Sequence, residues 1–300
     1  MVTAAPRLST TQVWWSAVRP ATLAASVAPV LTATAIAVHL DGVRWAAGLG
    51  ALVVALSIQL GVNFANDYSD FVRGADVNRV GPVRAASSGV VQPGHVRSAA
   101  IAAFGIAGVV GLALSVAFGL PLLIIGAACL LAGWLYTGGP RPYGYLGLGE
   151  VFVFIFFGLV ATLGTYYVET ARLTPLPITL LMSCAMGFLA TAILVLNNLR
   201  DIATDLAAGK RTLATRIGRE RTRILLLLLV SAAFAMPVLL LITQGASPTV
   251  LLVLLAIPIA AVPVRLAFGS TAASDLVRAL QRMAAAQLIY ALLFTLGVLL

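Results

Sequence analysis

Long apolar runs fill most of the chain, and short polar or glycine- and proline-containing breaks separate them. Nine runs are long enough to cross a bilayer as helices, since a spanning helix needs about 20 mostly apolar residues. We predict spans at residues 20–39, 45–65, 98–118, 120–137, 148–168, 175–197, 222–243, 248–268 and 280–300. The runs are continuous rather than alternating, which favours an all-α helical bundle over a membrane barrel.

The composition agrees with a polytopic membrane protein. Of the 300 residues, 61% are hydrophobic and only 10% are charged, and the mean hydropathy is +1.03. A soluble domain of this length is far less apolar. The sequence therefore predicts one transmembrane domain over residues 1–300, in which residues 1–18 form a short segment before the first span.

Basic residues give the predicted bundle an orientation, because Lys and Arg in short loops stay on the cytoplasmic side. We place the N-terminus and the connections after spans two, four, six and eight in the cytoplasm. That side then holds 17 of the 19 basic residues, all except Arg44 and Arg172. The bias explains the net charge of +9 without a nucleic-acid partner. We expect a multi-pass protein of the cell membrane, in contact with the lipid bilayer.

Five of the seven aspartates lie in two of the predicted cytoplasmic connections, those after spans two and six. These acids are Asp67, Asp70, Asp76, Asp201 and Asp205. If both spans continue as helices through their polar ends, three- and four-residue steps place Asp67 and Asp70 on one face of the first helix and Asp201 and Asp205 on one face of the second, each with nearby asparagines. The asparagines are Asn63, Asn66 and Asn197. The sequence thus predicts two oxygen-rich stripes at the same membrane face.

Carboxylate and amide oxygens are the ligands that Mg(II) prefers, with water and substrate phosphate oxygens completing its shell. Because clustered carboxylates repel one another unless a cation intervenes, we expect a divalent ion between the stripes. Cations that suit phosphate are interleaved with the acids. They are Arg73, Arg79, Arg84, Arg200, Lys210 and Arg211. Acids and bases at one mouth predict a metal–diphosphate site, although Asp76 is also explained as a turn residue beside Gly74.

At these residues the sequence resembles the UbiA superfamily of intramembrane prenyltransferases, which carry an NDxxD-type motif after the second helix and a DxxxD motif after the sixth. Here the motifs are Asn66-Asp67-Tyr68-Ser69-Asp70 and Asp201-Ile202-Ala203-Thr204-Asp205. Four segments are similar to the branch of the superfamily that acts on 1,4-dihydroxy-2-naphthoate, and they extend over most of the chain. They are RPATLAASVAPV, NFANDYSDFVRGADVNRVGPVRAASSG, YTGGPRPYGYLGLGEVFVFIFFG and NNLRDIATDLAAGKRTLATRIGR. Ala75 departs from the pattern, since many members have Thr there.

The resemblance implies transfer of a polyprenyl group from polyprenyl diphosphate to 1,4-dihydroxy-2-naphthoate, with loss of diphosphate and carbon dioxide, giving demethylmenaquinone. It implies that Mg(II) is held by Asp67, Asp70, Asp201 and Asp205, which are catalytic together with Lys210. The residues expected to contact the substrates are Asn63, Asn66, Arg73, Asp76, Arg141, Tyr143, Asn197, Arg200, Arg211, Arg19 and Tyr136. The spacing from Tyr136 to Arg141 differs from the Tyr-xxx-Lys arrangement of 4-hydroxybenzoate enzymes and favours a naphthoate acceptor.

The reaction also needs a dry pocket for the allylic cation and the isoprenoid chain. Aromatic faces of Tyr68, Tyr136, Tyr143 or Phe154 could stabilise the cation through cation–π contact, or could serve only as packing. We expect small residues such as Gly158 and Gly164 to leave room for an apolar groove that opens to lipid.

Alternative functions share some of these features. The same diphosphate site could serve another acceptor, such as homogentisate, 4-hydroxybenzoate, chlorophyllide or haem. Acids inside a helical bundle also mark ion pathways, so a cation-coupled transporter is a hypothesis of a different class. Transporter sites lie near mid-membrane in broken helices, however, whereas these stripes are predicted at helix ends. A CDP-alcohol phosphotransferase is disfavoured because its acids lie in one contiguous signature that is missing here.

Overall fold

The structure is a computed structural model, and it describes residues 8–40, 42–74, 83–172 and 177–300. Every regular element in these ranges is helical, which confirms the predicted all-α class. The elements are α1 (Thr10–Val18), α2 (Pro20–His39), α3 (Trp45–Val72), α4 (Pro93–Phe118), α5 (Leu120–Leu135), η1 (Tyr143–Leu146), α6 (Gly149–Val153), η2 (Phe154–Val160), α7 (Ala161–Thr170), α8 (Pro177–Ala207), α9 (Leu213–Gln244), η3 (Pro248–Ala256), α10 (Ile257–Gly269) and α11 (Ala273–Leu299).

Each of the nine predicted spans corresponds to a helical segment. Within the described residues, eight segments are long and apolar enough to cross a membrane, and α5 is a shorter apolar helix between them. Helices α6, η2 and α7 follow one another without a break and form a single span, Gly149–Thr170. Helices α3 and α8 continue to Val72 and Ala207, beyond their predicted ends at 65 and 197, so the acidic stripes do lie on helices.

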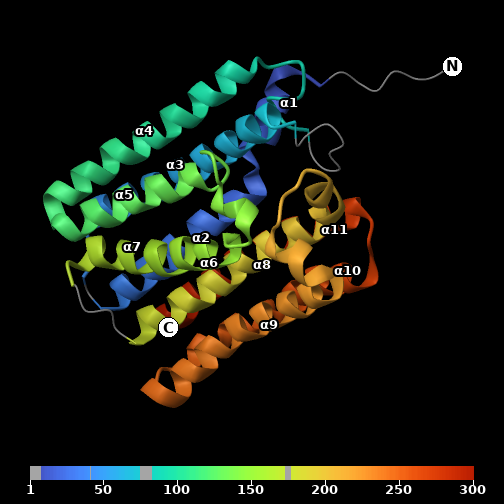
Figure 1. Cartoon of the computed structure of the whole chain (residues 1–300). Helices are drawn as coiled ribbons and strands as arrows, with labels where there is room; N and C mark the ends of the chain where they lie inside the picture. Colours follow the sequence, from blue (N-terminus) through green and yellow to red (C-terminus); the bar gives the residue numbers. More distant parts are fainter. Residues whose placement is uncertain (1–7, 41, 75–82, 173–176) are drawn as a thin grey trace.

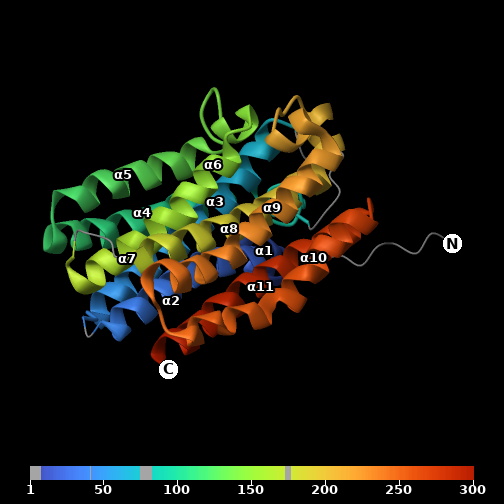
Figure 2. The same cartoon turned by 90° about the horizontal axis from the view of Figure 1, so that it is seen from below.

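The helices lie side by side and run between two ends of the molecule, with α1 toward one end and the C-terminus at the other (Figures 1 and 2). Helix α8 lies inside the bundle. In an apolar stretch of 18 residues within this helix, 67% of the residues are buried. It packs on α9, η2, α11 and α2. Helices α4 and α5 form an outer layer in which apolar side chains are exposed. In the corresponding stretch of 18 residues in α4, only 17% of the residues are buried. Such a face suits contact with lipid.

A close helix contact forms where η2 meets α8. A Cβ atom added at Gly158 would lie 2.4 Å from the Cα of Gly187, so the two backbones can approach this closely only because Gly158 has no side chain. This corrects the expectation that Gly158 opens a groove for the isoprenoid chain. Gly164, two turns further on, does line a cavity, and a Cβ there would have no other atom within 4 Å.

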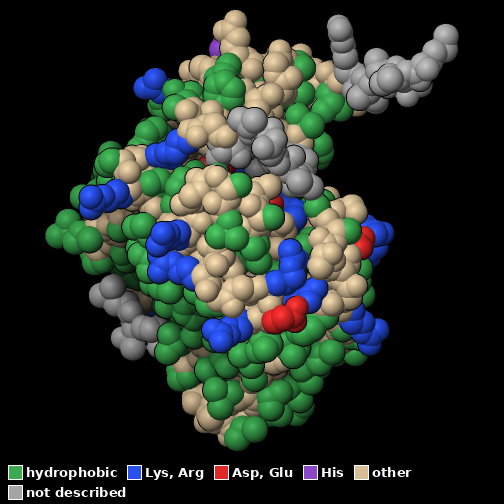
Figure 3. Space-filling view, turned by 45° about the vertical axis from the view of Figure 1, so that its right-hand side comes forward, with side chains coloured by type: hydrophobic (Ala, Val, Ile, Leu, Met, Phe, Trp, Pro, Cys, Tyr) green, Lys and Arg blue, Asp and Glu red, His purple; other side chains and the backbone are tan. Residues whose placement is uncertain are grey.

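Basic side chains gather at one end of the bundle. Figure 3 shows Lys and Arg spread over the face that lies on the right-hand side of Figure 1, with few acidic side chains among them. Arg44 and Arg172 lie at the opposite end, where the backbone N–H of Arg44 donates to the carbonyl of Glu169 near the end of α7. The clustering agrees with the predicted charge asymmetry between the two ends.

Candidate functional site

A polar cavity of about 80 Å³ lies among the ends of α3 and α8, the α1–α2 junction and the connections after α5 and α8. Both predicted acidic stripes contribute to its wall. The residues that line it are Arg19, Asn66, Asp70, Arg84, Tyr136, Thr137, Gly144, Tyr145, Asn197, Asn198, Asp201, Thr204, Asp205, Lys210 and Thr212. The fold therefore brings together two motifs that lie far apart in the sequence.

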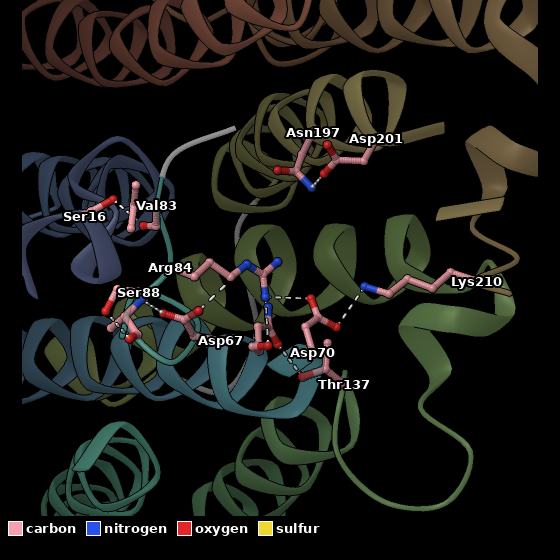
Figure 4. A network of polar contacts seen from close by, with 12 residues as sticks. Ser16, Asp67, Asp70, Val83, Arg84, Ser88, Thr137, Asn197, Asp201 and Lys210 are labelled. Carbon is pink, nitrogen blue, oxygen red and sulfur yellow. Dashed lines mark hydrogen bonds and ion pairs between the residues drawn. The ribbon is translucent and has the colours of Figure 1, made fainter. Parts of the chain in front are cut away.

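Asp70 is the most heavily bonded acid of this cavity (Figure 4). Its Oδ2 lies 2.6 Å from Nη1 of Arg84, and its Oδ1 lies 2.8 Å from Nζ of Lys210. The hydroxyl of Tyr145 also donates to Oδ1, and Lys210 Nζ lies 4.6 Å from the centre of the Tyr145 ring. Two cations thus compensate one buried carboxylate, and their attraction offsets the free-energy cost of removing this charge from water.

Arg84 and Tyr145 complete this cluster. Besides Asp70, Arg84 binds the backbone carbonyl of Asn66 at 2.9 Å, so it holds the end of α3 in place. Burial, together with the nearby Asp70 carboxylate, raises the pKa of the Tyr145 phenol above its usual value. The phenol therefore stays protonated and remains a hydrogen-bond donor. The sequence placed Arg84 only among the phosphate-binding cations, and it gave no reason to single out Tyr145 or Thr137.

The second acidic motif is organised by Arg200. Its Nε and Nη2 lie 2.7 and 2.6 Å from the two carboxylate oxygens of Asp201, and Nη2 also donates to Oδ1 of Asn197 at 2.9 Å. Asp205, one turn further along α8, is buried and lines the cavity. Arg200 is therefore a clamp on Asp201 and Asn197, and it does not itself line the polar cavity.

Asp67 is placed differently from the expectation that it holds a metal ion. It is fully buried, its Oδ2 accepts a hydrogen bond from the backbone N–H of Ala85 at 2.8 Å, and Nε of Arg84 lies 3.9 Å from Oδ1. A three-residue step on an α-helix leaves side chains about 60° apart. That angle turns Asp67 toward the segment at 83–91 while Asp70 faces the cavity.

Asn63 also lies outside the wall of the polar cavity. Its amide nitrogen donates to the carbonyl of Val18 at 2.9 Å and to Oγ1 of Thr22 at 3.1 Å, and its oxygen accepts from Gln59. These bonds tie α3 to the α1–α2 junction, where Arg19 has a left-handed backbone with φ of 52°. Asn63 thus supports the junction that presents Arg19 to the cavity, and its predicted contact with the substrate stays a prediction.

Three further predicted contacts are not brought to the cavity wall. Arg73 donates to the carbonyls of Thr137 and Gly139 and so holds the connection after α5. The side chains of Arg141 and Arg211 are exposed outside the cavity. Asp76 lies outside the residues that the structure describes.

A larger apolar cavity of about 410 Å³ adjoins the polar one. Its wall comes from α3, α4, α5 and the α6–α7 span, and Tyr136 lines both cavities. Tyr143 lines the apolar cavity, where its ring stacks on Phe152 at 4.1 Å and its hydroxyl donates to the carbonyl of Ala132. Phe154 instead packs on Phe188. A polar and an apolar cavity with a shared wall suit a ligand with a charged head and a hydrocarbon tail.

The charges of the polar cavity show how the acids are balanced. Among the described residues, no group of three or more His, Cys, Asp or Glu side chains is gathered tightly enough to hold one ion. Arginine and lysine, rather than a metal alone, compensate the acids. The described wall carries three basic and three acidic side chains, so its formal charge is zero. Carboxylates of both motifs still face the cavity, and they suit a hard cation whose shell is completed by phosphate oxygens.

The fold and this site define an intramembrane protein built to bind an anionic amphiphile. The model of the UbiA prenyltransferase family matches residues 26–299. This chain belongs to that family.

Sequence relatives share most of their length with this chain. The 1,4-dihydroxy-2-naphthoate octaprenyltransferase of Mycobacterium tuberculosis is 42% identical over 93% of this chain and 94% of its own. The enzymes of the same name from Mycobacterium leprae and Escherichia coli are 44% and 38% identical, over 77% and 72% of this chain and 78% and 72% of their own.

Solved structures share the fold at low sequence identity. An apo UbiA homologue from Aeropyrum pernix K1 has a TM-score of 0.65 at 13% identity, over 95% of this chain and 98% of its own. A UbiA homologue from Archaeoglobus fulgidus bound to DMAPP and Mg2+ has a TM-score of 0.56 at 14% identity, over 94% and 99%.

Proposed function

We propose that this protein transfers a polyprenyl group from polyprenyl diphosphate to 1,4-dihydroxy-2-naphthoate in menaquinone synthesis, releasing diphosphate and carbon dioxide. The observation that carries the proposal is the polar cavity with both acidic motifs, joined through Tyr136 to an apolar cavity. The diphosphate occupies the first cavity and the start of the isoprenoid chain the second. The names of the sequence relatives support the naphthoate acceptor.

Mg(II) is the cofactor that this site suits. A diphosphate adds at least about two negative charges, and a wall of zero formal charge does not balance them. One or two of the carboxylates of Asp70, Asp201 and Asp205, with the amide oxygens of Asn66 and Asn197 and oxygens of the diphosphate, would hold the ion, which when bound would withdraw charge from the leaving group as a Lewis acid. The Mg2+ and DMAPP bound by the Archaeoglobus fulgidus homologue support this assignment.

The side chains of this protein contribute the remaining chemistry. Lys210 and Arg84 stabilise the negative charge that collects on the diphosphate when the allylic carbon–oxygen bond breaks and its electron pair moves to the leaving group. The acceptor ring carbon that bears the carboxylate forms the new carbon–carbon bond. Carbon dioxide then leaves, and its bonding electron pair restores the aromatic ring, which gives demethylmenaquinone in its quinol form. The apolar wall around Tyr143 keeps water away from the allylic cation.

We place the protein in the cell membrane with the polar cavity toward the cytoplasm. The support is the gathering of basic side chains at the end of the bundle that carries the cavity. A protease-accessibility assay on sealed, inside-out vesicles tests this orientation, because the connection after α5 should then be cleaved from the outside.

The test of the function is an assay of the purified protein in detergent or liposomes with polyprenyl diphosphate, 1,4-dihydroxy-2-naphthoate and Mg(II). We expect a prenylated naphthoquinol and one carbon dioxide per turnover, and loss of both when EDTA is added. Homogentisate and 4-hydroxybenzoate, supplied in competition, should not be prenylated at comparable rates. A folded protein that prenylates none of these acceptors would overturn the proposal.

A further inference from the structure

A buried acid that the proposed chemistry does not use lies beside the polar cavity. Glu150 is the second residue of α6 and is 7% exposed. Its Oε1 accepts a hydrogen bond from Nδ2 of Asn198 on α8 at 2.9 Å. Its Oε2 is buried and has no hydrogen-bond partner among the described residues. Buried carboxyl groups with an unsatisfied oxygen are uncommon in folded proteins, so this one calls for a reason.

The partner of Glu150 belongs to the cavity wall. Asn198 lines the polar cavity next to Asn197, but in the described part of the chain it is bonded to neither Arg200 nor Asp201. Since its nitrogen is used by Glu150, the carbonyl oxygen on the same carbon atom is turned elsewhere. Glu150 therefore fixes which way this amide faces.

Tyr136 lies close to the same pair. A Cβ atom added at Gly149, the residue before Glu150, would lie 3.7 Å from the Tyr136 hydroxyl. The Tyr136 hydroxyl, in its usual neutral form, can donate a hydrogen bond. We call Tyr136, Glu150 and Asn198 the junction cluster, because Tyr136 lines both cavities.

The position of the junction cluster matters for the acceptor. If the diphosphate lies in the polar cavity and the chain in the apolar one, the allylic carbon between them lies at the boundary beside Tyr136. The acceptor ring must reach that carbon, so its hydroxyl groups come close to the polar side chains of the junction cluster. This step rests on the proposed function.

We propose that Glu150 is a positioning residue for the aromatic acceptor. By its hydrogen bond it orients the Asn198 amide so that the carbonyl oxygen faces the cavity and accepts a hydrogen bond from a hydroxyl group of the acceptor ring. The Tyr136 hydroxyl is the neighbouring donor. The role of Glu150 is that of a hydrogen-bond acceptor and does not need a negative charge, so glutamine, which also offers an Oε1 atom, can replace it.

The experiment measures initial rates of purified variants with donor and acceptor varied separately. Glu150→Leu and Asn198→Leu should each raise the KM for 1,4-dihydroxy-2-naphthoate at least about tenfold while the donor KM stays within about twofold. Glu150→Gln should stay within about threefold of wild type in both constants. The double variant Glu150→Leu with Asn198→Leu should be no worse than Asn198→Leu alone, because both changes remove the same contact.

Thr191→Val is the matched control. Thr191 is buried on α8, its hydroxyl donates to the carbonyl of Gly187, and it meets Glu150 only at the backbone carbonyl, at 3.5 Å. Its acceptor KM should not change. Thermal unfolding of every variant separates misfolding from altered binding, and Asn198→Leu and Glu150→Gln still decide the question if Glu150→Leu does not fold.

Three results would overturn the inference: a donor KM that rises as much as the acceptor KM, an effect of Glu150→Gln as large as that of Glu150→Leu, or unchanged kinetics in all variants. Each presupposes an active wild-type protein. A wild type that is folded but prenylates no acceptor is a different result, and it overturns the proposed function itself.

Discussion

Nζ of Lys210 lies 2.8 Å from Oδ1 of Asp70, although 140 residues separate them in the sequence. The contact joins the end of α3 to the connection between α8 and α9 (Figure 4), and both residues line the polar cavity. Lys210 contacts both acidic motifs, since its Nζ is bonded to Asp70 and its backbone N–H donates to the carbonyl of Asp205. That arrangement leaves Lys210 able to turn from Asp70 to a diphosphate.

Lys210 is the single lysine of the chain, so its role can be tested by chemistry as well as by mutation. Acetylation of the protein should lower kcat at least about a hundredfold, since a fixed cation on the leaving group is lost. Lys210→Gln should reproduce the loss, and Lys210→Arg should recover part of it. Donor and Mg(II) added before the reagent should protect activity. An acetylated protein that keeps full turnover would remove Lys210 from the mechanism.

Arg84 should not be replaceable by lysine. Its guanidinium binds Asp70 and the carbonyl of Asn66, and a lysine ammonium cannot reproduce both contacts in the same geometry. We expect Arg84→Lys to lower kcat/KM for the donor at least about tenfold. Arg278→Lys, at an exposed arginine that pairs with Asp275, is the matched control and should leave kcat/KM unchanged. Equal effects of the two substitutions would contradict this role.

Asp67 and Asp201 should respond differently to neutralisation. Asp201 lines the cavity, so we expect Asp201→Asn to raise the Mg(II) concentration for half-maximal activity at least about tenfold. Asp67 binds the backbone of Ala85 instead, so Asp67→Asn should leave that concentration within about twofold and lower thermal stability. A magnesium titration of both variants decides this, and a tenfold rise in Asp67→Asn would support the metal-binding role that the sequence predicts for Asp67.

The sequence predicted the bundle well because a membrane span needs only a continuous apolar run of sufficient length, which can be read directly along the chain. The first span, residues 20–39, coincides with α2, and the remaining ones differ mainly where polar turns extend a helix, as at the ends of α3 and α8. Hydropathy does not detect polar helical turns, whereas the three- and four-residue spacing of the acids indicated that the helices continue through them. That the two acidic motifs lie on helices was therefore predictable.

The neighbours of those acids were not predictable from spacing. A helical step of three residues was enough to send Asp67 away from Asp70, and only tertiary packing decides which of the two faces the cavity. Tyr145 reaches Asp70 from the connection after α5, across 75 residues, and no local pattern marks that contact. Glu150 was hidden in an otherwise apolar run. Within the described residues, the side-chain hydrogen bond that its carboxyl group accepts comes from Asn198, on another helix.

The contact between Gly158 and Gly187 should be sensitive to a single methyl group. Gly158→Ala would place Cβ 2.4 Å from the Gly187 backbone, so the helices must separate. We expect a destabilisation of about 1–3 kcal/mol and a lower Tm. Gly164→Ala is the control, because its Cβ would have no other atom within 4 Å. A Gly158→Ala protein that melts with the wild type would show that the two backbones have room to move apart.

Because the polar cavity has a formal charge of zero, binding of the diphosphate and binding of Mg(II) in the proposed reaction are coupled. A free diphosphate would meet Asp70, Asp201 and Asp205 along with the cations, and a free divalent ion would meet Arg84 and Lys210 along with the acids. Each ligand relieves the repulsion that the other encounters, so their affinities rise together by thermodynamic linkage. The cavity is in this sense a receptor for an ion-paired complex, and it discriminates against either component arriving by itself.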